Sequence, residues 1–443
     1  MKLISFEVSN HRSFRDDVYF DFARPILTTN LPPVGNSWSE CLFPVAVVVG
    51  ANASGKTNLL RAMDFVSEAV RRSSTSWLEA DQMPRDSFQL SPETRNGLSR
   101  YAIDFVTDVA SKGTELRYRY EFEIGRAGVE MEELKQYKSS RPTMLLECKR
   151  VDGKLRLRYG AQMGSAPQLS DRELALSRAR QVGHEILGPL ADELANLRTY
   201  NVGDQERQRR IQWITRDLAE GKLSVERLQL LAQAADIGIS RIELDERDLP
   251  SEVTKFLEAI EKHLAESGAG EGESKEPKVS EENRIRIARS LRFIHNQTEG
   301  EEVSFGIEDE SAGTIAWLAL AFAVLDVLRN GGLLLVDELD TSLHPHLAAE
   351  IVRLFQDPDT NRNGGQILLT THDVTLLEND TDLQLDYRQV WFTQKNLDGS
   401  SELFSAADFG LKPKSNLAKQ YREGRLGGVP LLTMSLIRDM ILS

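Results

Sequence analysis

Cysteine is nearly absent from this sequence, since only Cys41 and Cys148 occur among 443 residues. Two cysteines are too few for a disulfide framework or a zinc cluster, and their scarcity fits a reducing compartment. Long apolar runs are missing as well, because the longest, Ile315–Leu325, stops at Asp326 and is too short to cross a bilayer. We therefore interpret that run as a buried helix and expect a cytoplasmic protein without a membrane partner.

The N-terminal segment lacks the features of a secretory signal. MKLISFEVSN carries one basic residue and then alternates around Ile4, Phe6 and Val8, which is the period-two pattern of a strand. Long heptad runs and internal repeats are also missing, so neither an extended coiled coil nor a repeat architecture is expected. These absences favour an ordinary globular protein that is not exported.

Basic residues are outnumbered, with 54 Lys and Arg against 68 Asp and Glu and a formal net charge of −14. This balance argues against a protein that coats nucleic acid with its whole surface, and it leaves direct DNA binding an open question. One local basic patch, Arg207–Arg210 together with Arg216, could meet phosphates or an acidic partner. A solvated helix face explains the same residues more simply.

The pattern along the chain predicts three parts. Residues 1–160 read as strands, a loop and a helix, followed from about residue 100 by an antiparallel sheet. Residues 161–290 read as a mainly helical insertion, with a flexible loop at 267–278 that is nearly empty of apolar residues. Residues 291–443 alternate between strands and helices, which implies a parallel sheet covered by helices. We therefore expect an α/β fold in which both ends of the chain complete one domain.

Residues 50–57, GANASGKT, match the phosphate-loop pattern G-x-x-x-x-G-K-T. They follow an apolar run and open a segment of helical periodicity, so backbone N–H groups and a helix N-terminus would surround a pyrophosphate. We expect Lys56 to reach the terminal phosphates and the Thr57 hydroxyl to bind Mg²⁺. The other nucleotide ligands predicted in and after the phosphate loop are Gly50, Asn52, Ser54, Gly55 and Asn58.

Two further apolar segments end in polar side chains. Residues 333–338, LLLVDE, present adjacent carboxylates, of which Asp337 suits the Mg²⁺ shell and Glu338 suits the polarisation of an attacking water. Residues 366–373, QILLTTHD, lead to His372, which is suited to sense or stabilise the terminal phosphate. The first of these segments and the phosphate loop need each other to build one metal site, so we predict that they converge.

Together these motifs resemble the ABC-type ATPases of the RecF, SMC and OLD kind. They resemble more closely a bacterial group of stand-alone, AAA-labelled ABC ATPases found beside nucleases in phage-defence operons, such as the ATPase subunit of PARIS-like systems. The resemblance implies an ABC-type ATPase head with an antiparallel β subdomain and a helical insertion. The shared segments are NHRSF at 10–14, the phosphate loop, DESAGT at 309–314, DELDTSLHP at 337–345, THD at 371–373 and YREGRLGGVP at 421–430.

The resemblance also implies an assembly. In such ATPases two nucleotides lie between two heads, each held by the phosphate loop of one head and the signature segment, here 309–314, of the other. A homodimer or higher homo-oligomer is thus implied, in which Ser311, Gly313 and Thr314 act in trans and Asp340 communicates across the dimer. This signature departs from the usual Leu-Ser-Gly-Gly-Gln, which leaves the strength of the trans contact open.

Three further residues receive roles from the same resemblance. His372 corresponds to the switch histidine, and Arg12 to a phosphate contact near the N-terminus. Gln89 is a candidate for the glutamine that senses the metal ion in such ATPases. The interpretation as an exposed loop glutamine without such a role has equal weight.

The resulting hypothesis is an ATPase with ATP and Mg²⁺ as cofactors that scaffolds and controls an effector protein in bacterial antiphage defence. The expected partners are a nuclease encoded nearby and a phage-encoded trigger. One alternative is a DNA repair or recombination ATPase of the RecF and SMC type, and another is an ATP-gated scaffold with slow turnover. A transporter ATPase is disfavoured by the large insertion and the missing Gln-rich signature.

Overall fold

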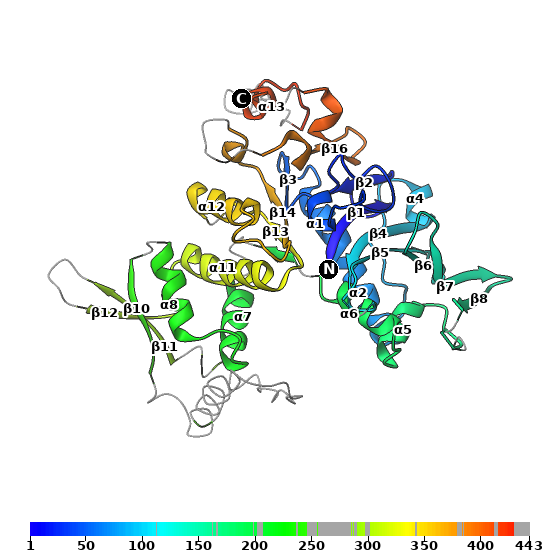
Figure 1. Cartoon of the computed structure of the whole chain (residues 1–443), viewed down its shortest axis with the longest axis horizontal. Helices are drawn as coiled ribbons and strands as arrows, with labels where there is room; N and C mark the ends of the chain where they lie inside the picture. Colours follow the sequence, from blue (N-terminus) through cyan, green and yellow to red (C-terminus); the bar gives the residue numbers. More distant parts are fainter. Residues whose placement is uncertain are drawn as a thin grey trace, which may run out of the picture. The chain divides into compact units, whose positions relative to one another are not determined.

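The computed structural model is shown in Figure 1. It describes residues 1–428 except 112, 162, 165–166, 198, 202–206, 236–237, 246–254, 256–284, 286, 288–289, 297–301, 342, 379–382, 384 and 412–414. The loop predicted at 267–278 thus lies outside the described residues. The chain forms two compact units: Met1–Tyr200 with Val327–Glu338 and Ala349–Ser443, and Asn201–Asp326 with Leu339–Ala348.

The first unit contains a six-stranded sheet in the order β16-β15-β3-β14-β13-β9. Strands β13, β14, β3 and β15 are mutually parallel, and β16 pairs antiparallel with β15. Every residue of β3 and β14 is buried, as expected of central strands covered on both faces. The strands are β3 (Val45–Gly50), β9 (Thr199–Asn201), β13 (Leu333–Asp337), β14 (Gln366–Thr371), β15 (Val390–Lys395) and β16 (Ser401–Ser405).

A second sheet of the first unit is antiparallel, with seven strands in the order β2-β1-β4-β5-β6-β7-β8. The sheet confirms the predicted antiparallel subdomain. Its apolar side chains belong to the same core as those of the neighbouring helices. The sheet also takes in the two N-terminal strands, because β1 pairs with β4. The strands are β1 (Lys2–Ser9), β2 (Val18–Asp21), β4 (Ser99–Thr107), β5 (Leu116–Ile124), β6 (Val129–Tyr137), β7 (Thr143–Val151) and β8 (Lys154–Tyr159).

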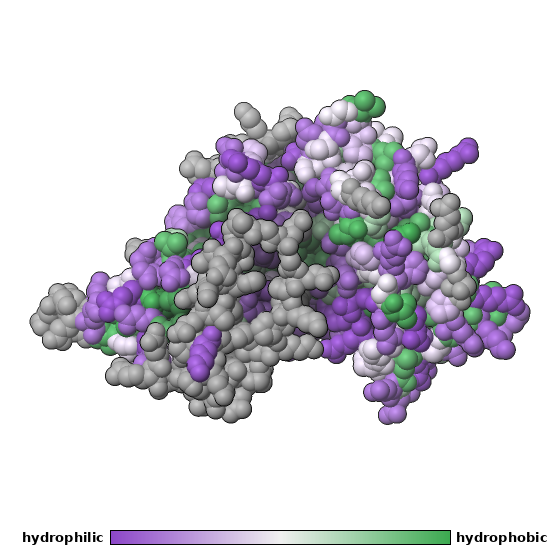
Figure 2. Space-filling model, turned by 60° about the horizontal axis from the view of Figure 1, so that its bottom comes forward, coloured by the Kyte–Doolittle hydropathy of each residue, from purple (hydrophilic) through white to green (hydrophobic). Residues whose placement is uncertain are grey.

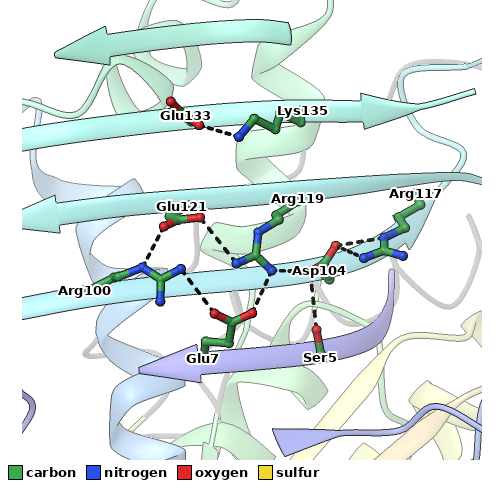
Figure 3. A network of polar contacts seen from close by, with 9 residues as sticks. All are labelled: Ser5, Glu7, Arg100, Asp104, Arg117, Arg119, Glu121, Glu133 and Lys135. Carbon is green, nitrogen blue, oxygen red and sulfur yellow. Dashed lines mark hydrogen bonds and ion pairs between the residues drawn. The ribbon is translucent and has the colours of Figure 1, made fainter. Parts of the chain in front are cut away.

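Charged side chains alternate with the apolar ones along these strands and form an ion-pair network (Figure 3). Arg119 contacts Glu7 at 2.9 Å and Asp104 at 2.6 Å, and Arg117 contacts Asp104 at 2.8 Å. Burial acts to raise the pKa of Glu7, but hydrogen bonds and charges from Arg119 and Arg100 outweigh it, so the net shift is downward. The network joins β1, β4 and β5, and Asp104 and Arg119, which lie directly opposite each other on β4 and β5, carry opposite charges.

Helix α2 follows the phosphate loop and packs against α5 and α6. The sequence placed α5 and α6 in the insertion, whereas both fall in the first compact unit because their leucines enter its core. The described helices around this unit are α1 (Trp38–Cys41), α2 (Lys56–Arg72), α3 (Ser76–Glu79), α4 (Pro92–Asn96), α5 (Ala175–Gln181), α6 (Leu187–Ala195), α12 (Pro345–Gln356), η3 (Thr375–Leu377), η4 (Tyr387–Gln389), η5 (Ala406–Phe409) and α13 (Leu417–Arg422).

The second unit combines helices with a small antiparallel sheet in the order β10-β11-β12. Of these three strands β10 falls within the predicted insertion 161–290, whereas β11 and β12 follow it in the sequence. The second unit therefore extends beyond the predicted boundary at residue 290. On the face of the molecule shown in Figure 2, hydrophilic side chains cover most of the described surface, and hydrophobic ones are scattered among them. The elements are α7 (Arg207–Ala219), α8 (Val225–Ala234), β10 (Ile239–Leu244), β11 (Leu291–Asn296), β12 (Glu302–Gly306) and α11 (Ala312–Asn330).

Helix α11 contains the longest apolar run of the sequence. Its 19 residues make it the only helix in the described part of the chain that is long and apolar enough to cross a membrane. Within its most apolar window 61% of the residues are buried inside the protein, which is the environment of a core helix. The interpretation of this run as a buried helix therefore agrees with the structure.

The basic patch predicted around Arg207–Arg210 is not a continuous basic surface. Arg210 is only 2% exposed, and the Arg207 guanidinium donates to backbone carbonyls of the same unit. Arg216 pairs with its neighbour Asp217 at 2.9 Å. Both predicted interpretations, a phosphate-binding patch and a solvated face, are therefore wrong for Arg210, which faces the interior.

Candidate functional site

The predicted motifs of the first unit lie at the carboxyl ends of adjacent parallel strands. In the register of the sheet, Thr371 of β14 lies opposite Val49 of β3, and Val336 of β13 lies opposite Leu369. The phosphate loop, Glu338 and His372 thus follow directly from three neighbouring strand ends. Such an edge is where open α/β sheets bind their ligands.

The phosphate loop passes from β3 into α2 through backbone positions that need glycine. Gly55 has a φ of 122°, and a Cβ on Gly50 would lie 2.3 Å from Thr393 Oγ1. Lys56 begins α2, is 7% exposed, and donates from Nζ to the carbonyls of Gly50 at 2.7 Å and Ala51 at 3.0 Å. The Ser54 hydroxyl bonds to Thr393 Oγ1 at 2.5 Å, which ties the loop to β15. The Lys56 ammonium group is thus held within the phosphate loop by the loop's own carbonyls.

Asp337 lies beside the phosphate loop at the end of β13. Its Oδ1 accepts hydrogen bonds from Thr57 Oγ1 at 3.2 Å and from Thr370 Oγ1 at 2.6 Å. The hydroxyl of Thr370 in turn accepts from the backbone N–H of Glu338 at 2.9 Å. Glu338 has a φ of 54°, a left-handed conformation that is uncommon for a non-glycine residue and is often found at functional sites. Sequence reasoning missed Thr370, which fixes both carboxylate residues.

The oxygens of Thr57 and Asp337 fit Mg²⁺. Their separation of 3.2 Å is close to the distance of about 3 Å expected between adjacent ligands of an octahedral Mg²⁺ ion. Within the described part of the chain, no group of three or more His, Cys, Asp or Glu side chains could cage a metal. Two protein ligands suit Mg²⁺, which usually takes its other ligands from water and substrate phosphates.

A third carboxyl group, Asp64, lies on α2 two turns after Thr57, and sequence reasoning missed it. Burial raises the pKa of Asp64 to about 6, and the negative charge of Asp337 acts in the same direction. The backbone N–H of Thr199 donates to Asp64 at 3.2 Å and opposes that shift. The spacing of seven residues from Thr57, which returns to the same helix face, was a signal that could have identified it.

The opening segment 10–14 approaches the phosphate loop through Ser13. The Ser13 hydroxyl accepts a hydrogen bond at 2.6 Å from Nδ2 of Asn58, the third residue of α2. Arg12 has a φ of 49° and pairs with Asp86, with Nε and a terminal nitrogen 2.8 Å and 2.7 Å from Oδ2. The predicted phosphate contact is therefore held by a carboxylate that sequence reasoning did not identify.

Arg12 lines a cavity of about 430 Å³. Three of the lining side chains are cationic and one is acidic, so the cavity favours an anion. Gln89 also lines it, but it is an exposed loop residue whose amide donates to the carbonyl and hydroxyl of Ser87, both at 2.9 Å. The complete lining is Arg12, Ser13, Arg85, Asp86, Ser87, Phe88, Gln89, Leu90, Lys395 and Gly399.

His372 is exposed immediately after β14. The next residue, Asp373, accepts hydrogen bonds at 2.9 Å and 2.6 Å from the backbone and hydroxyl of Thr375, which begins the short helix η3. This turn fixes the backbone on the C-terminal side of the histidine, whose side chain stays accessible at the sheet edge.

Asn52, also predicted as a ligand, is an exposed residue of the phosphate loop. The predicted ligands not yet described belong to the second unit. Ser311 precedes α11, and its hydroxyl accepts the backbone N–H of Thr314 at 3.0 Å, as a helix N-cap does. Gly313 lies in the first turn and is half-buried, as is Asp340 further along the chain. Ser342, within the predicted segment 337–345, lies outside the described residues.

The C-terminal segment contacts the phosphate loop through the backbone of Gly428. The carbonyl of Gly428 accepts hydrogen bonds from the Ala51 backbone at 3.1 Å and from the Tyr421 hydroxyl at 2.8 Å. Gln394 of β15 accepts the N–H of Gly428 at 3.1 Å. The described part of the predicted closing motif, 421–428, thus supports the loop, while 429–430 lie outside the described residues.

Comparisons with known proteins add a family and several structures. A family profile described as "AAA domain, putative AbiEii toxin, Type IV TA system" matches residues 45–378. Among curated proteins, none matches the chain.

Similar solved structures include an SMC head bound to the C-winged helix domain of ScpA, with 16% identity, a TM-score of 0.39 and coverage of 95% of this chain and 100% of that chain. They also include the SMC head domain of Thermotoga maritima, with 12% identity, a TM-score of 0.40 and coverage of 91% and 99%. A third is the recombination mediator protein RecF with ATP, with 13% identity, a TM-score of 0.33 and coverage of 91% and 99%.

Proposed function

The chain belongs to this AAA-domain family, and from that premise we propose that it binds and hydrolyses ATP with Mg²⁺ at the edge of its parallel sheet. The observation that carries the proposal is the pair of oxygens on Thr57 and Asp337, 3.2 Å apart beside a phosphate loop. That arrangement joins two motifs separated by 280 residues into one site for a phosphate-bound cation.

The residues of this site divide the chemistry among them. The backbone N–H groups of the loop and the start of α2 would hold the phosphates, and Lys56 would exchange its loop carbonyls for the terminal phosphate oxygens. Mg²⁺, when bound by Thr57 and Asp337, supplies positive charge to the phosphates. Glu338, whose backbone is fixed by Thr370, would orient the attacking water, and His372 would contact the terminal phosphate from the neighbouring strand end.

The test compares Lys56→Ala with Glu338→Gln. We expect Lys56→Ala to weaken ATP binding at least about tenfold, because the variant lacks the only side-chain cation of the loop. Glu338→Gln should keep binding and lose about a hundredfold or more in kcat, because the amide cannot take a proton from water. Equilibrium titration with ATP and phosphate release would measure both, with Lys154→Ala on the exposed strand β8 as control.

Hydrolysis by Glu338→Gln at the parent rate would show that the water-orienting residue is wrongly assigned. Unchanged ATP binding by Lys56→Ala would contradict the assignment of the phosphate loop itself.

We further propose that the active form is a cytoplasmic homodimer or higher homo-oligomer that controls an effector in antiphage defence. Ser311, Gly313 and Thr314 of one copy would complete the site of the other, and Asp340 would communicate between copies. The support for this step is the motif resemblance together with the family description, which names a putative toxin. A nuclease effector and a phage-encoded trigger belong to the same proposal.

A DNA repair ATPase is the second candidate, and one surface feature favours it. Strand β8 exposes Lys154, Arg156 and Arg158 at alternate positions, although Arg156 pairs with Asp152 and Arg158 pairs with Glu147. A basic strand of this kind can contact phosphates, and it can equally protect a sheet edge from pairing. Salt-sensitive DNA binding by the purified protein that requires ATP and is lost in Arg156→Gln would support this candidate.

A further inference from the structure

The signature segment 309–314 of the second unit is held by side chains from other elements of that unit. One terminal nitrogen of Arg207, at the start of α7, donates to the carbonyls of Glu308 at 2.8 Å and Glu310 at 2.7 Å. A third carbonyl, that of Ile307, lies 3.4 Å away. Arg207 therefore binds the turn that connects β12 to α11.

A second contact comes from the small sheet. His295 of β11 lies with Nε2 2.7 Å from Glu310 Oε1, and the Glu310 side chain is only 5% exposed. His295 also packs edge-on against Phe305 of β12, with ring centroids 5.2 Å apart. Because β12 ends at Gly306, these contacts fix the chain on both sides of the turn.

A third contact holds α11 itself. The indole nitrogen of Trp317 donates to the Leu231 carbonyl of α8 at 2.7 Å. Ser311 caps the first turn of α11 through its hydrogen bonds with Thr314. A shift of Ser311 would therefore also move the start of this helix or the turn before it. The position of the signature hydroxyl thus depends on α7, α8 and β11.

Arg207 is the contact best suited to control that position. Residues 307–310 form turns between β12 and α11, and Arg207 donates from another element to the carbonyls of Glu308 and Glu310. A guanidinium has a rigid, planar arrangement of donors, so it can fix several acceptors in one geometry. Loss of this side chain would remove these hydrogen bonds next to the signature, and the turn would relax towards solvent.

We propose that Arg207 is a positioning residue for ATP hydrolysis: it holds Ser311 and Gly313 in the geometry needed to meet the nucleotide bound by another copy. The inference rests on the proposed function, in which the signature acts in trans. It also makes α7 a control point, because any partner that moves this helix would change turnover without touching the phosphate loop.

The test begins with Arg207→Gln and the matched control Arg209→Gln, two positions further along α7 and exposed. We expect Arg207→Gln to keep the ATP affinity of the single chain within about twofold, since the phosphate loop is intact, and to lose at least about tenfold in kcat. Arg209→Gln should behave like the parent, and Arg207→Lys should recover part of the rate. Parent-like turnover by Arg207→Gln would overturn the proposal.

Mixing of variants separates a trans defect from misfolding. Arg207→Gln retains a phosphate loop and Lys56→Ala retains a signature, so a mixed dimer contains one site built from two intact halves. The mixture should hydrolyse ATP faster than the sum of the separate variants. The reference mixture, Ser311→Ala with Lys56→Ala, should show the same gain.

The outcomes separate the two claims. A gain in the reference mixture without one in the Arg207→Gln mixture would overturn the role of Arg207 and leave the proposed function intact. Absence of a gain in both mixtures would overturn the trans arrangement itself. A gain in both would support the positioning role, because a misfolded chain cannot contribute a working phosphate loop.

Discussion

At the scale of single residues, Glu132 of β6 is a buried carboxyl group outside the site. It is fully buried, and its oxygens accept hydrogen bonds from the Tyr120 hydroxyl at 2.9 Å and from the backbone N–H groups of Ala175 at 2.5 Å and Leu176 at 2.9 Å. Burial nevertheless raises the pKa of Glu132 to about 7, from an ordinary value of 4.5. This carboxyl group ties the antiparallel sheet to the start of α5.

The raised pKa makes the stability of the fold depend on pH. Below pH 4.5 both states hold the proton, and between pH 4.5 and about 7 the unfolded chain loses it first. Stability from Glu132 is therefore lost as the pH rises through this window, by on the order of 3 kcal/mol. Urea unfolding at pH 5 and pH 8 gives the free energy of unfolding of the parent and of Glu132→Gln. We expect the parent to lose stability relative to Glu132→Gln as the pH rises from 5 to 8. A pH-independent difference would contradict the prediction.

Residues in contiguous motifs were predictable from the sequence, while their partners were not. Lys56 and Asp337 follow from local patterns that also indicate where a strand ends. Thr370 and Thr393 bond to Asp337 and Ser54 from strands far along the chain, and a hydroxyl in a buried strand carries no local signal of its partner. Asp86, which pairs with Arg12, could not be predicted either, because it lies in an irregular loop whose sequence does not indicate its partner.

At the scale of elements, the closing segment 421–428 should control the phosphate loop. Gly427 has a φ of 65°, and a Cβ there would lie 2.6 Å from Gln394 Oε1 and 2.9 Å from Phe404 Cζ. Gly427→Ala must therefore displace the segment whose next carbonyl, at Gly428, binds the Ala51 backbone. We expect ATP affinity to fall several-fold.

Gly424→Ala is the matched control for that prediction. Its φ of 73° imposes a similar backbone strain, on the order of 1 kcal/mol, but a Cβ at Gly424 would meet nothing within 4 Å. Titration with a fluorescent ATP analogue should give the parent affinity for Gly424→Ala and a weaker one for Gly427→Ala. Equal affinities in the two variants would show that the closing segment does not support the loop.

Local periodicity predicted the type of most elements and failed at their pairing. Alternation over residues 100–160 indicated an antiparallel sheet, and strands β4 to β8 form it. The joining of β1 to β4 and the packing of α5 and α6 on α2 depend on contacts between distant segments, which periodicity does not contain. The signature segment was recognised as a motif, but its contacts with Arg207 required the structure.

At the scale of the whole molecule, the first unit draws on both ends of the chain, with Met1–Tyr200 and Ala349–Ser443 in one compact body. This arrangement puts the phosphate loop and Asp337 in one unit and Ser311 and Asp340 in the other. A site completed by a second copy would therefore make turnover a property of the assembly. Loss of ATP binding and loss of turnover should then both disable the assembly, the first by preventing its formation and the second by preventing its reset.

A phage challenge of cells that carry this gene with its native neighbours tests whether ATP binding and turnover are both required. We expect the parent to protect and Lys56→Ala to lose protection by orders of magnitude in plaque counts, because no nucleotide can join the copies. Glu338→Gln should bind ATP and fail to reset the assembly, and we expect it to lose protection too, with immunoblots confirming equal protein levels. Full protection by Glu338→Gln would instead show that ATP binding alone is the signal, as in a scaffold with slow turnover. A parent that protects against no phage in a broad panel would contradict the defence proposal and favour the DNA repair candidate.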